Sequence, residues 1–141
     1  AAPFLAYNER GCVFLCHTSN PGACDFQELD VGGEPLYQRI ARTIAGEWNA
    51  DRNCALVVGA TFPEELKVIR GIVGDMPLLI PGIGAQGGDV EATVRNGKTA
   101  DGTGLVINSS RGILYASSGA GYADAAADAA RSLRDEINRY R

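Results

Sequence analysis

Residues 55–81 read ALVVGATFPEELKVIRGIVGDMPLLIP and contain one complete strand–helix–strand unit. The apolar runs ALVVGA (55–60) and LLIP (78–81) predict two short buried strands, because neither run alternates between polar and apolar residues. Two strands that are joined by a helix normally pair in parallel through a right-handed crossover. This unit therefore predicts the α/β class and a parallel sheet.

The segment between these two strands predicts a helix. Pro63 suits its first turn, and Thr61 with Glu64 fits a capping box, in which the two side chains satisfy free backbone N–H groups. The helix is expected to run to about residue 72 or 73. The apolar side chains expected to face the core are Leu66, Ile69 and Val73.

The same order of strand and helix extends along the whole chain, which we treat as a single domain over residues 1–141. Further strands are predicted at 13–16 and 104–108, and helices at 35–48, 89–95 and 121–140, with a short helical turn after the last strand. In the helix at 35–48, the predicted inward residues are Leu36, Ile40, Ile44 and Trp48. In the last helix they are Ala123, Ala126, Ala130, Leu133, Ile137 and Tyr140.

This order gives four strand–helix units and leaves two architectures open. One is an open α/β sheet, and the other is half of an eight-stranded (β/α) barrel, which needs roughly 250 residues when complete. The chain has 141 residues, close to half of that. The uniformly apolar strands are expected to be covered on both faces.

Composition excludes several classes of function. The net charge is −4 and there is no basic cluster, so nucleic acid is not expected as a partner. No apolar run approaches the roughly 20 residues that a membrane span needs. The first residue is Ala1 and not Met, which suggests a fragment or a processed piece.

The cysteines predict neither a metal site nor disulfides. The chain has four cysteines and one histidine, His17, with no C-x-x-C pair, so no Cys/His ligand set is formed. Cys12, Cys16 and Cys54 lie in or beside apolar segments, where buried free thiols are common. Reduced thiols indicate a cytoplasmic protein.

Candidate binding residues follow the predicted strands, because ligands in both architectures bind at the carboxyl ends of the strands. The four strand-end loops are HTSNPG (17–22), GATFP (59–63), PGIGAQGGD (81–89) and NSSRG (108–112). Glycine, hydroxyl and amide groups dominate them. Such residues allow a backbone to approach a ligand closely and supply hydrogen bonds.

Arg111 is the only cation in these loops apart from His17. A guanidinium beside free N–H groups at a helix start is suited to phosphate. Each residue also has a simpler interpretation: Arg111 as a surface ion-pair residue, Gln86 as a solvated amide, and Ser19 with Asn20 as a turn cap. Their joint placement at the ends of three strands favours one shared binding rim.

The strings HTSNPGACDFQ, LVVGAT, LLIPGIGAQGGD and NSSRGILYA resemble, in order and spacing, the C-terminal half of orotidine 5′-phosphate decarboxylase. The resemblance covers nearly the whole chain and is strongest to the longer, mycobacterial-type branch of that family. It implies a TIM (β/α)8 barrel, of which this chain would supply the last four β/α units. It also implies conversion of orotidine monophosphate to uridine monophosphate and CO₂, without a cofactor, in pyrimidine biosynthesis.

At the pyrimidine end, the resemblance implies three binding residues. Ser19 would contact the edge of the base. Pro81 and Gly82 would line the same side of the pocket. All three positions match the family's motifs residue by residue.

At the phosphate end, the resemblance implies that Arg111 binds the phosphate. A backbone N–H of Ser110 or Gly112 would assist it. Gln86 would reach the phosphate and bridge toward the serine of the first loop. These assignments agree with the interpretation of Arg111 from its surroundings alone.

The chain departs from the family in one respect, because the D-x-K-x-x-D motif of the reactive centre is absent. Its only lysines are Lys67 and Lys98, and neither has the motif around it. A lysine ammonium must protonate the carbon that loses CO₂. We therefore expect no catalytic residue in this chain and no activity of the chain alone.

Two other interpretations fit the same residues. The chain could be a non-catalytic nucleotide-binding half-barrel, in which case its two unpaired sheet edges favour a homodimer. It could also be another phosphate-binding barrel enzyme, related to the sugar-phosphate epimerases. The combination of TSNPG and GAQGG does not support this last interpretation.

Overall fold

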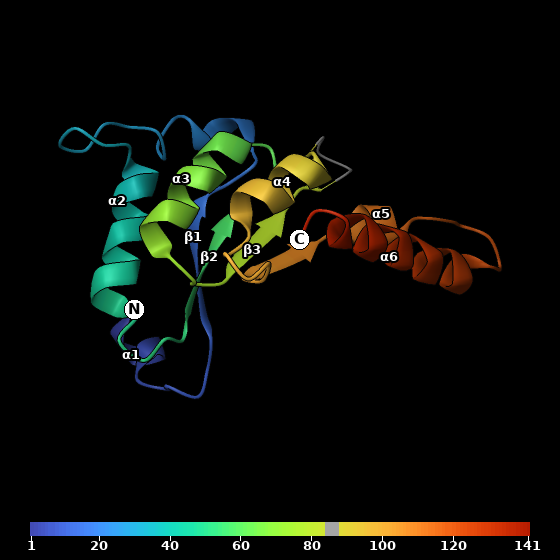
Figure 1. Ribbon diagram of the computed structural model, residues 1–141, viewed down its shortest axis with the longest axis horizontal. Helices are drawn as coiled ribbons and strands as arrows, with labels where there is room; N and C mark the ends of the chain where they lie inside the picture. The colour runs from blue at the N-terminus through green and yellow to red at the C-terminus, as the bar shows by residue number, and fades with distance from the viewer. Residues whose placement is uncertain (84–87) are drawn as a thin grey trace.

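The computed structural model describes residues 1–83 and 88–141, and its centre is a parallel sheet of four strands (Figure 1). The strands are β1 (Cys12–His17), β2 (Cys54–Val58), β3 (Leu78–Pro81) and β4 (Leu105–Asn108). They lie side by side in sequence order. The α/β class and the four strand predictions are confirmed.

The helices α2 (Leu36–Thr43), α3 (Pro63–Val73) and α4 (Val90–Gly97) cover one face of this sheet (Figure 1). A doubly wound open sheet reverses its strand order and has helices on both faces. Sequential strands with helices on one side are the arrangement of a (β/α)8 barrel. The four units therefore form half of a barrel.

The remaining helices lie around this half-barrel. They are α1 (Ala2–Leu5), the 3-10 turn η1 (Pro21–Ala23), the π-helical turn η2 (Ile44–Trp48), α5 (Ser110–Leu114) and α6 (Tyr122–Asn138). Helix α6 extends away from the sheet, and none of its residues is fully buried. Its predicted inward face is only partly buried, and Ala123 is exposed.

The core lies between the sheet and its three covering helices. Leu56, Leu78 and Ile80 point into it and are completely buried. Helix α3 contributes its three predicted core residues, Leu66, Ile69 and Val73, and all of them are buried. The spacing of the apolar residues in α3 therefore predicted its packing face correctly.

The opposite face of the sheet is not covered by any helix in the described part of the chain, and the expectation of cover on both faces is wrong. Val13, Leu15 and Val106 point to this open face and are 53%, 66% and 55% exposed. Helices in β/α units pack on the outside of a barrel, and the inner face is filled by the strands on the opposite side. A half-barrel leaves that inner face bare.

Two local predictions about helices also need correction. The proposed capping box does not form, because Phe62 is the N-cap residue of α3 and the buried Thr61 Oγ1 has no hydrogen-bond partner among the described residues. The helix predicted at 35–48 changes to a π-helical turn at Ile44. Tyr37 and Ala41 are buried in place of the predicted Leu36 and Ile40.

Candidate functional site

A cavity of about 230 Å³ lies where β3 and β4 end side by side. The register of the two strands pairs Pro81 with Asn108, so the loops that follow leave the sheet at the same level. The residues lining the cavity are Pro81, Gly82, Ile83, Asn108, Ser109, Ser110 and Arg111. The structure thus brings together four of the residues that the sequence predicted to bind a ligand.

Two local features shape the walls of this cavity. Gly82 has a positive φ of 101°, a conformation that favours glycine. Ile83 is buried, and its carbonyl accepts a hydrogen bond of 3.4 Å from Ser109 Oγ. This bond links the loop after β3 to the loop after β4.

Arg111 supplies the positive charge of the cavity. It lies in the first turn of α5 and is exposed. Within the part of the chain that the structure describes, no carboxylate pairs with its guanidinium. A guanidinium in this state can offer a planar pair of donors to two oxygens of a phosphate.

Gly112 does not line the same cavity, although the sequence predicted it beside Arg111 in the site. It lines a neighbouring cavity of about 370 Å³ between α4, α5 and α6. A Cβ atom on Gly112 would lie 2.7 Å from Ser109 Oγ. Ser109 is the N-cap residue of α5, so the absence of a side chain at Gly112 leaves room for the Ser109 hydroxyl at the start of this helix.

Ser19 lies on the other side of the rim, after β1. Its Oγ is buried and has no hydrogen-bond partner among the described residues. A Cβ atom on Gly59 would lie 2.3 Å from this Oγ and 2.8 Å from the Ser19 backbone nitrogen. Only glycine at position 59 allows the loop after β1 to approach the end of β2 so closely.

Backbone hydrogen bonds join the loops after β1, β2 and β3 into one continuous rim. Gly59 N–H donates to the His17 carbonyl at 2.7 Å, and Ala60 N–H donates to the Pro81 carbonyl at 2.9 Å. The strand-end loops therefore meet at one edge of the sheet. Gln86 lies outside the described residues, so its predicted bridge between phosphate and serine stays a prediction.

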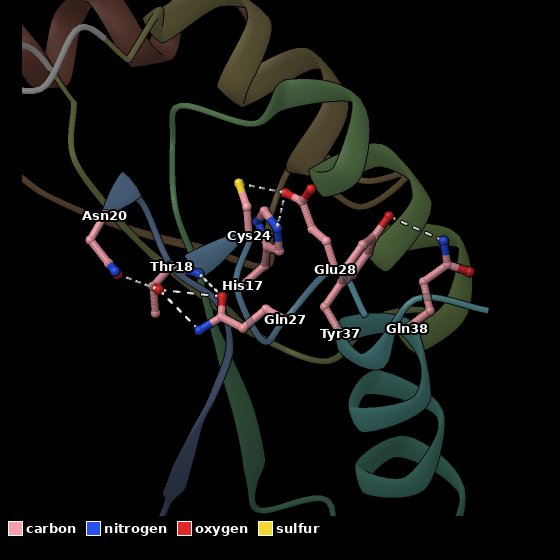
Figure 2. A network of polar contacts seen from close by, with 8 residues as sticks. All are labelled: His17, Thr18, Asn20, Cys24, Gln27, Glu28, Tyr37 and Gln38. Carbon is pink, nitrogen blue, oxygen red and sulfur yellow. Dashed lines mark hydrogen bonds and ion pairs between the residues drawn. The ribbon is translucent and has the colours of Figure 1, made fainter. Parts of the chain in front are cut away.

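Sequence reasoning missed a group of residues that make polar contacts in and near the loop after β1. Its members are His17, Thr18, Asn20, Cys24, Gln27, Glu28, Tyr37 and Gln38 (Figure 2). The His17 ring is fully buried and meets the rings of Tyr37 and Phe62 edge-on, with centroids 4.8 Å and 4.4 Å away. The string HTSNPGACDFQ contains five of these residues, but spacing in a loop does not predict which side chains meet.

The thiols of the chain are structural. All four cysteines are free. Cys16 donates to the Tyr37 carbonyl at 3.2 Å, and burial raises the pKa of its thiol to about 12. Cys24 is exposed, and its hydrogen bond to Glu28 raises its pKa as well, so neither group is a ready nucleophile.

The two lysines lie away from this rim. Lys67 lies on the exposed surface of α3, and Lys98 Nζ donates to the Tyr140 carbonyl at 3.0 Å, beyond the end of α4. No cluster of three or more metal-ligating side chains occurs within residues 1–83 and 88–141. In the same described ranges, no helix has the length and apolar character required to cross a membrane.

Comparison with known proteins places these features in a family. The model of the "Orotidine 5′-phosphate decarboxylase / HUMPS family" matches residues 3–126. Orotidine 5′-phosphate decarboxylases of Azoarcus sp. and Dechloromonas aromatica are each 62% identical to the chain over 139 residues, which is 99% of this chain and 52% of each relative. The chain therefore spans about half the length of these curated relatives.

Solved structures with the same fold include two from Leishmania donovani. Its UMP synthase superposes with a TM-score of 0.84 and 40% identity, over 95% of this chain and 29% of that chain. Its OMP decarboxylase superposes with a TM-score of 0.81 and 36% identity, over 96% of this chain and 51% of that chain. The half-barrel of this chain thus corresponds to about half of that decarboxylase.

Proposed function

The chain belongs to the orotidine 5′-phosphate decarboxylase / HUMPS family, and from this we propose that it is the part of such an enzyme that holds the phosphate and one edge of the pyrimidine. The whole enzyme would convert orotidine monophosphate to uridine monophosphate and CO₂. The chain would represent the C-terminal half of the barrel. The resemblance to the mycobacterial-type branch stays a prediction.

The observation that carries this proposal is the cavity between the ends of β3 and β4, with Arg111 on its wall. Each charge-assisted hydrogen bond from a guanidinium to phosphate contributes about 1.5–3 kcal/mol. Phosphate lies far from the bond that breaks. Its binding energy would hold the base in place at the reactive centre, which is how remote groups of a substrate assist catalysis.

The reacting groups would come from outside this chain. Loss of CO₂ breaks the bond between the carboxylate and the pyrimidine ring, and the carbon left behind must gain a proton. In the family a lysine ammonium provides it, but Lys67 and Lys98 both lie away from the rim. We therefore propose that this chain alone does not turn over. From the resemblance to the family, we also propose that the whole enzyme needs neither a cofactor nor a metal.

Calorimetric titration with uridine monophosphate tests the binding proposal. Replacing Arg111 by Ala should weaken binding by roughly 10- to 100-fold, the equivalent of one charge-assisted bond. Arg95→Ala is the matched control, because Arg95 pairs with Glu91 on the outer surface of α4. Equal binding by wild type and Arg111→Ala would mean that the phosphate assignment is wrong.

A spectrophotometric assay with orotidine monophosphate tests the second half of the proposal. The purified chain should show no decarboxylation above the uncatalysed rate. Turnover by the chain alone would show that its own residues form a reactive centre.

A second candidate function rests on the open face of the sheet. Val13, Leu15 and Val106 expose apolar surface there, and β1 and β4 are the edge strands of the sheet. Two copies could close a barrel if β4 of each copy paired with β1 of the other, which would give a non-catalytic, nucleotide-binding homodimer. Sedimentation velocity distinguishes this function, because Leu15→Glu should convert such a dimer to monomers, whereas a wild-type monomer would exclude it.

We also propose a cytoplasmic location for the protein. Four free cysteines support it, since free thiols persist in reducing compartments. Fluorescence microscopy of a tagged protein in cells would test the location.

A further inference from the structure

We propose that Gln27 is a positioning residue that sets the orientation of Ser19 toward the pyrimidine. The inference rests on the proposed function, because it takes Ser19 as the contact to the base. It concerns a residue that does not line the cavity between β3 and β4 and that would act only through its neighbours.

The side-chain amide of Gln27 makes two hydrogen bonds to Thr18, the residue before Ser19. Its Oε1 accepts a hydrogen bond of 2.8 Å from the Thr18 backbone N–H, and its Nε2 donates one of 3.1 Å to Thr18 Oγ1 (Figure 2). Thr18 Oγ1 in turn donates to Asn20 Oδ1 at 2.6 Å. Both sequence neighbours of Ser19 are therefore held by one chain of hydrogen bonds that begins at Gln27.

Gln27 can act as an anchor because its own backbone is fixed at both ends. Its N–H donates to the Ala23 carbonyl at 2.7 Å, within the turn that follows η1. Its carbonyl accepts from Tyr37 N–H at 2.9 Å, in the first turn of α2. Tyr37 is itself buried in the core, so the hydrogen bonds from Gln27 to Thr18 connect the loop to the core.

Ser19 is held from the opposite side by Gly59, at the end of β2. The space there is too small for a Cβ atom, which would come within 2.3 Å of Ser19 Oγ. The Oγ is buried and has no partner among the described residues. A buried hydroxyl without a partner costs free energy, and a polar atom on a pyrimidine edge would supply the missing hydrogen bond.

The contacts of Gln27 and the phosphate cavity are separate. None of the residues that Gln27 touches lines the cavity between β3 and β4. Loss of the Gln27 side chain should therefore loosen the contact to the base and leave the phosphate contact unchanged. A residue with a merely structural role would weaken both contacts together.

The test compares two ligands and two glutamines by titration calorimetry on the 141-residue chain. Uridine monophosphate reports on base and phosphate, and ribose 5-phosphate reports on phosphate alone. Gln27→Ala should weaken binding of uridine monophosphate about tenfold, as expected for two neutral hydrogen bonds, with no change for ribose 5-phosphate. Gln38→Ala is the matched control, since Gln38 is equally half-buried and donates to Tyr37 Oη at 3.1 Å, away from Thr18.

The possible outcomes separate this inference from the proposed function. If Gln27→Ala binds uridine monophosphate as wild type does, or loses both ligands equally, the positioning role is wrong and the proposed function stands. If wild type binds neither ligand, the proposed function fails and the inference fails with it. Should Gln27→Ala not fold, Gln27→Glu decides, because it keeps the acceptor for Thr18 N–H, loses the donor to Thr18 Oγ1, and should show a smaller loss for uridine monophosphate only.

Discussion

The two ends of the sheet carry arginines in opposite states. At the amino end of β3 and β4, Arg70 donates to four backbone carbonyls, those of Gly74, Met76, Gly97 and Gly104, at 2.5–2.9 Å. At the carboxyl end, Arg111 faces a cavity and pairs with no carboxylate in the described residues. The Arg70 guanidinium stabilises the fold through its four hydrogen bonds, whereas the Arg111 guanidinium can bind a ligand.

Other polar groups also differ between the two ends of the sheet in whether they have hydrogen-bond partners. At the amino end, the Asp101 carboxylate accepts from Thr99 and from the backbone and hydroxyl of Thr103. At the carboxyl end, Ser19 Oγ has no partner among the described residues. In (β/α)8 barrels the amino end serves stability and the carboxyl end binds substrates. Half a barrel therefore already shows this division between a stabilising end and a binding end.

The largest effect should come from Arg70→Met, which keeps the apolar stem and removes the donors. Four carbonyls would lose a charged donor, and hydrogen bonds to charged groups contribute about 1.5–3 kcal/mol each. We therefore expect the free energy of unfolding to fall by at least ~3 kcal/mol. Urea denaturation followed by circular dichroism measures this loss.

The same substitution at the other end should behave differently. Arg111→Met should change the free energy of unfolding by less than ~0.5 kcal/mol, as is usual for an exposed residue without structural partners. A similar loss in both variants would remove the distinction between the two ends.

A smaller effect is expected from Gly59→Ala. The new Cβ would clash with Ser19, and overpacking of this kind costs about 1–3 kcal/mol. The clash should also displace Ser19 and weaken binding of uridine monophosphate more than that of ribose 5-phosphate. Thermal unfolding and calorimetry give the two quantities.

Gly71→Ala is the matched control for this change, because no atom lies within 4 Å of a Cβ at that position of α3. It should stabilise the chain by roughly 0.5–1 kcal/mol, through the higher helix propensity of Ala. If Gly59→Ala were equally stabilising, the close approach of the first two strand-end loops would be wrong.

The smallest effect should come from Asp101→Asn and should depend on pH. Hydrogen bonds from Thr99 and then Thr103 lower the pKa of the Asp101 carboxyl in the folded chain. The charged form thus stabilises the fold above the pKa of the unfolded state, and this contribution is lost as pH falls through the folded value. Urea midpoints of wild type and variant should differ at pH 7 and converge as pH falls from the ordinary Asp pKa of about 3.9 through the lower pKa of the folded chain; a constant difference would contradict this role.

Much of the fold could be predicted from the sequence, because it depends on local patterns. The range of β3 and the inward face of α3 follow from apolar runs and helical spacing. The inward face of α2 could not be predicted from apolar spacing, because Tyr37, whose ring packs against His17, and the small Ala41 take the fully buried positions. The bare inner face was missed because apolar strands look the same whether or not another surface covers them.

The candidate site, too, could be predicted only in part from the sequence. Arg111 and its neighbours were predicted because they follow a strand directly, and the parallel sheet brings strand ends together. Gly112 was placed one cavity away because α5 turns its backbone toward α6. The hydrogen bonds between Gln27 and Thr18 were not predicted, because contacts of loop side chains depend on tertiary structure and not on spacing.

Amide chemical shifts give the most direct test of the central claim, that the carboxyl end of β3 and β4 binds a nucleotide phosphate. The sheet carries an internal control, because a second cavity of about 230 Å³ lies at the amino end of β4, lined by residues that include Gly102, Thr103 and Arg141. On addition of uridine monophosphate, we expect shifts at the amides of Gly82, Ser110 and Arg111 and none at Gly102 or Thr103. Shifts confined to the second cavity, or absent from both, would contradict it.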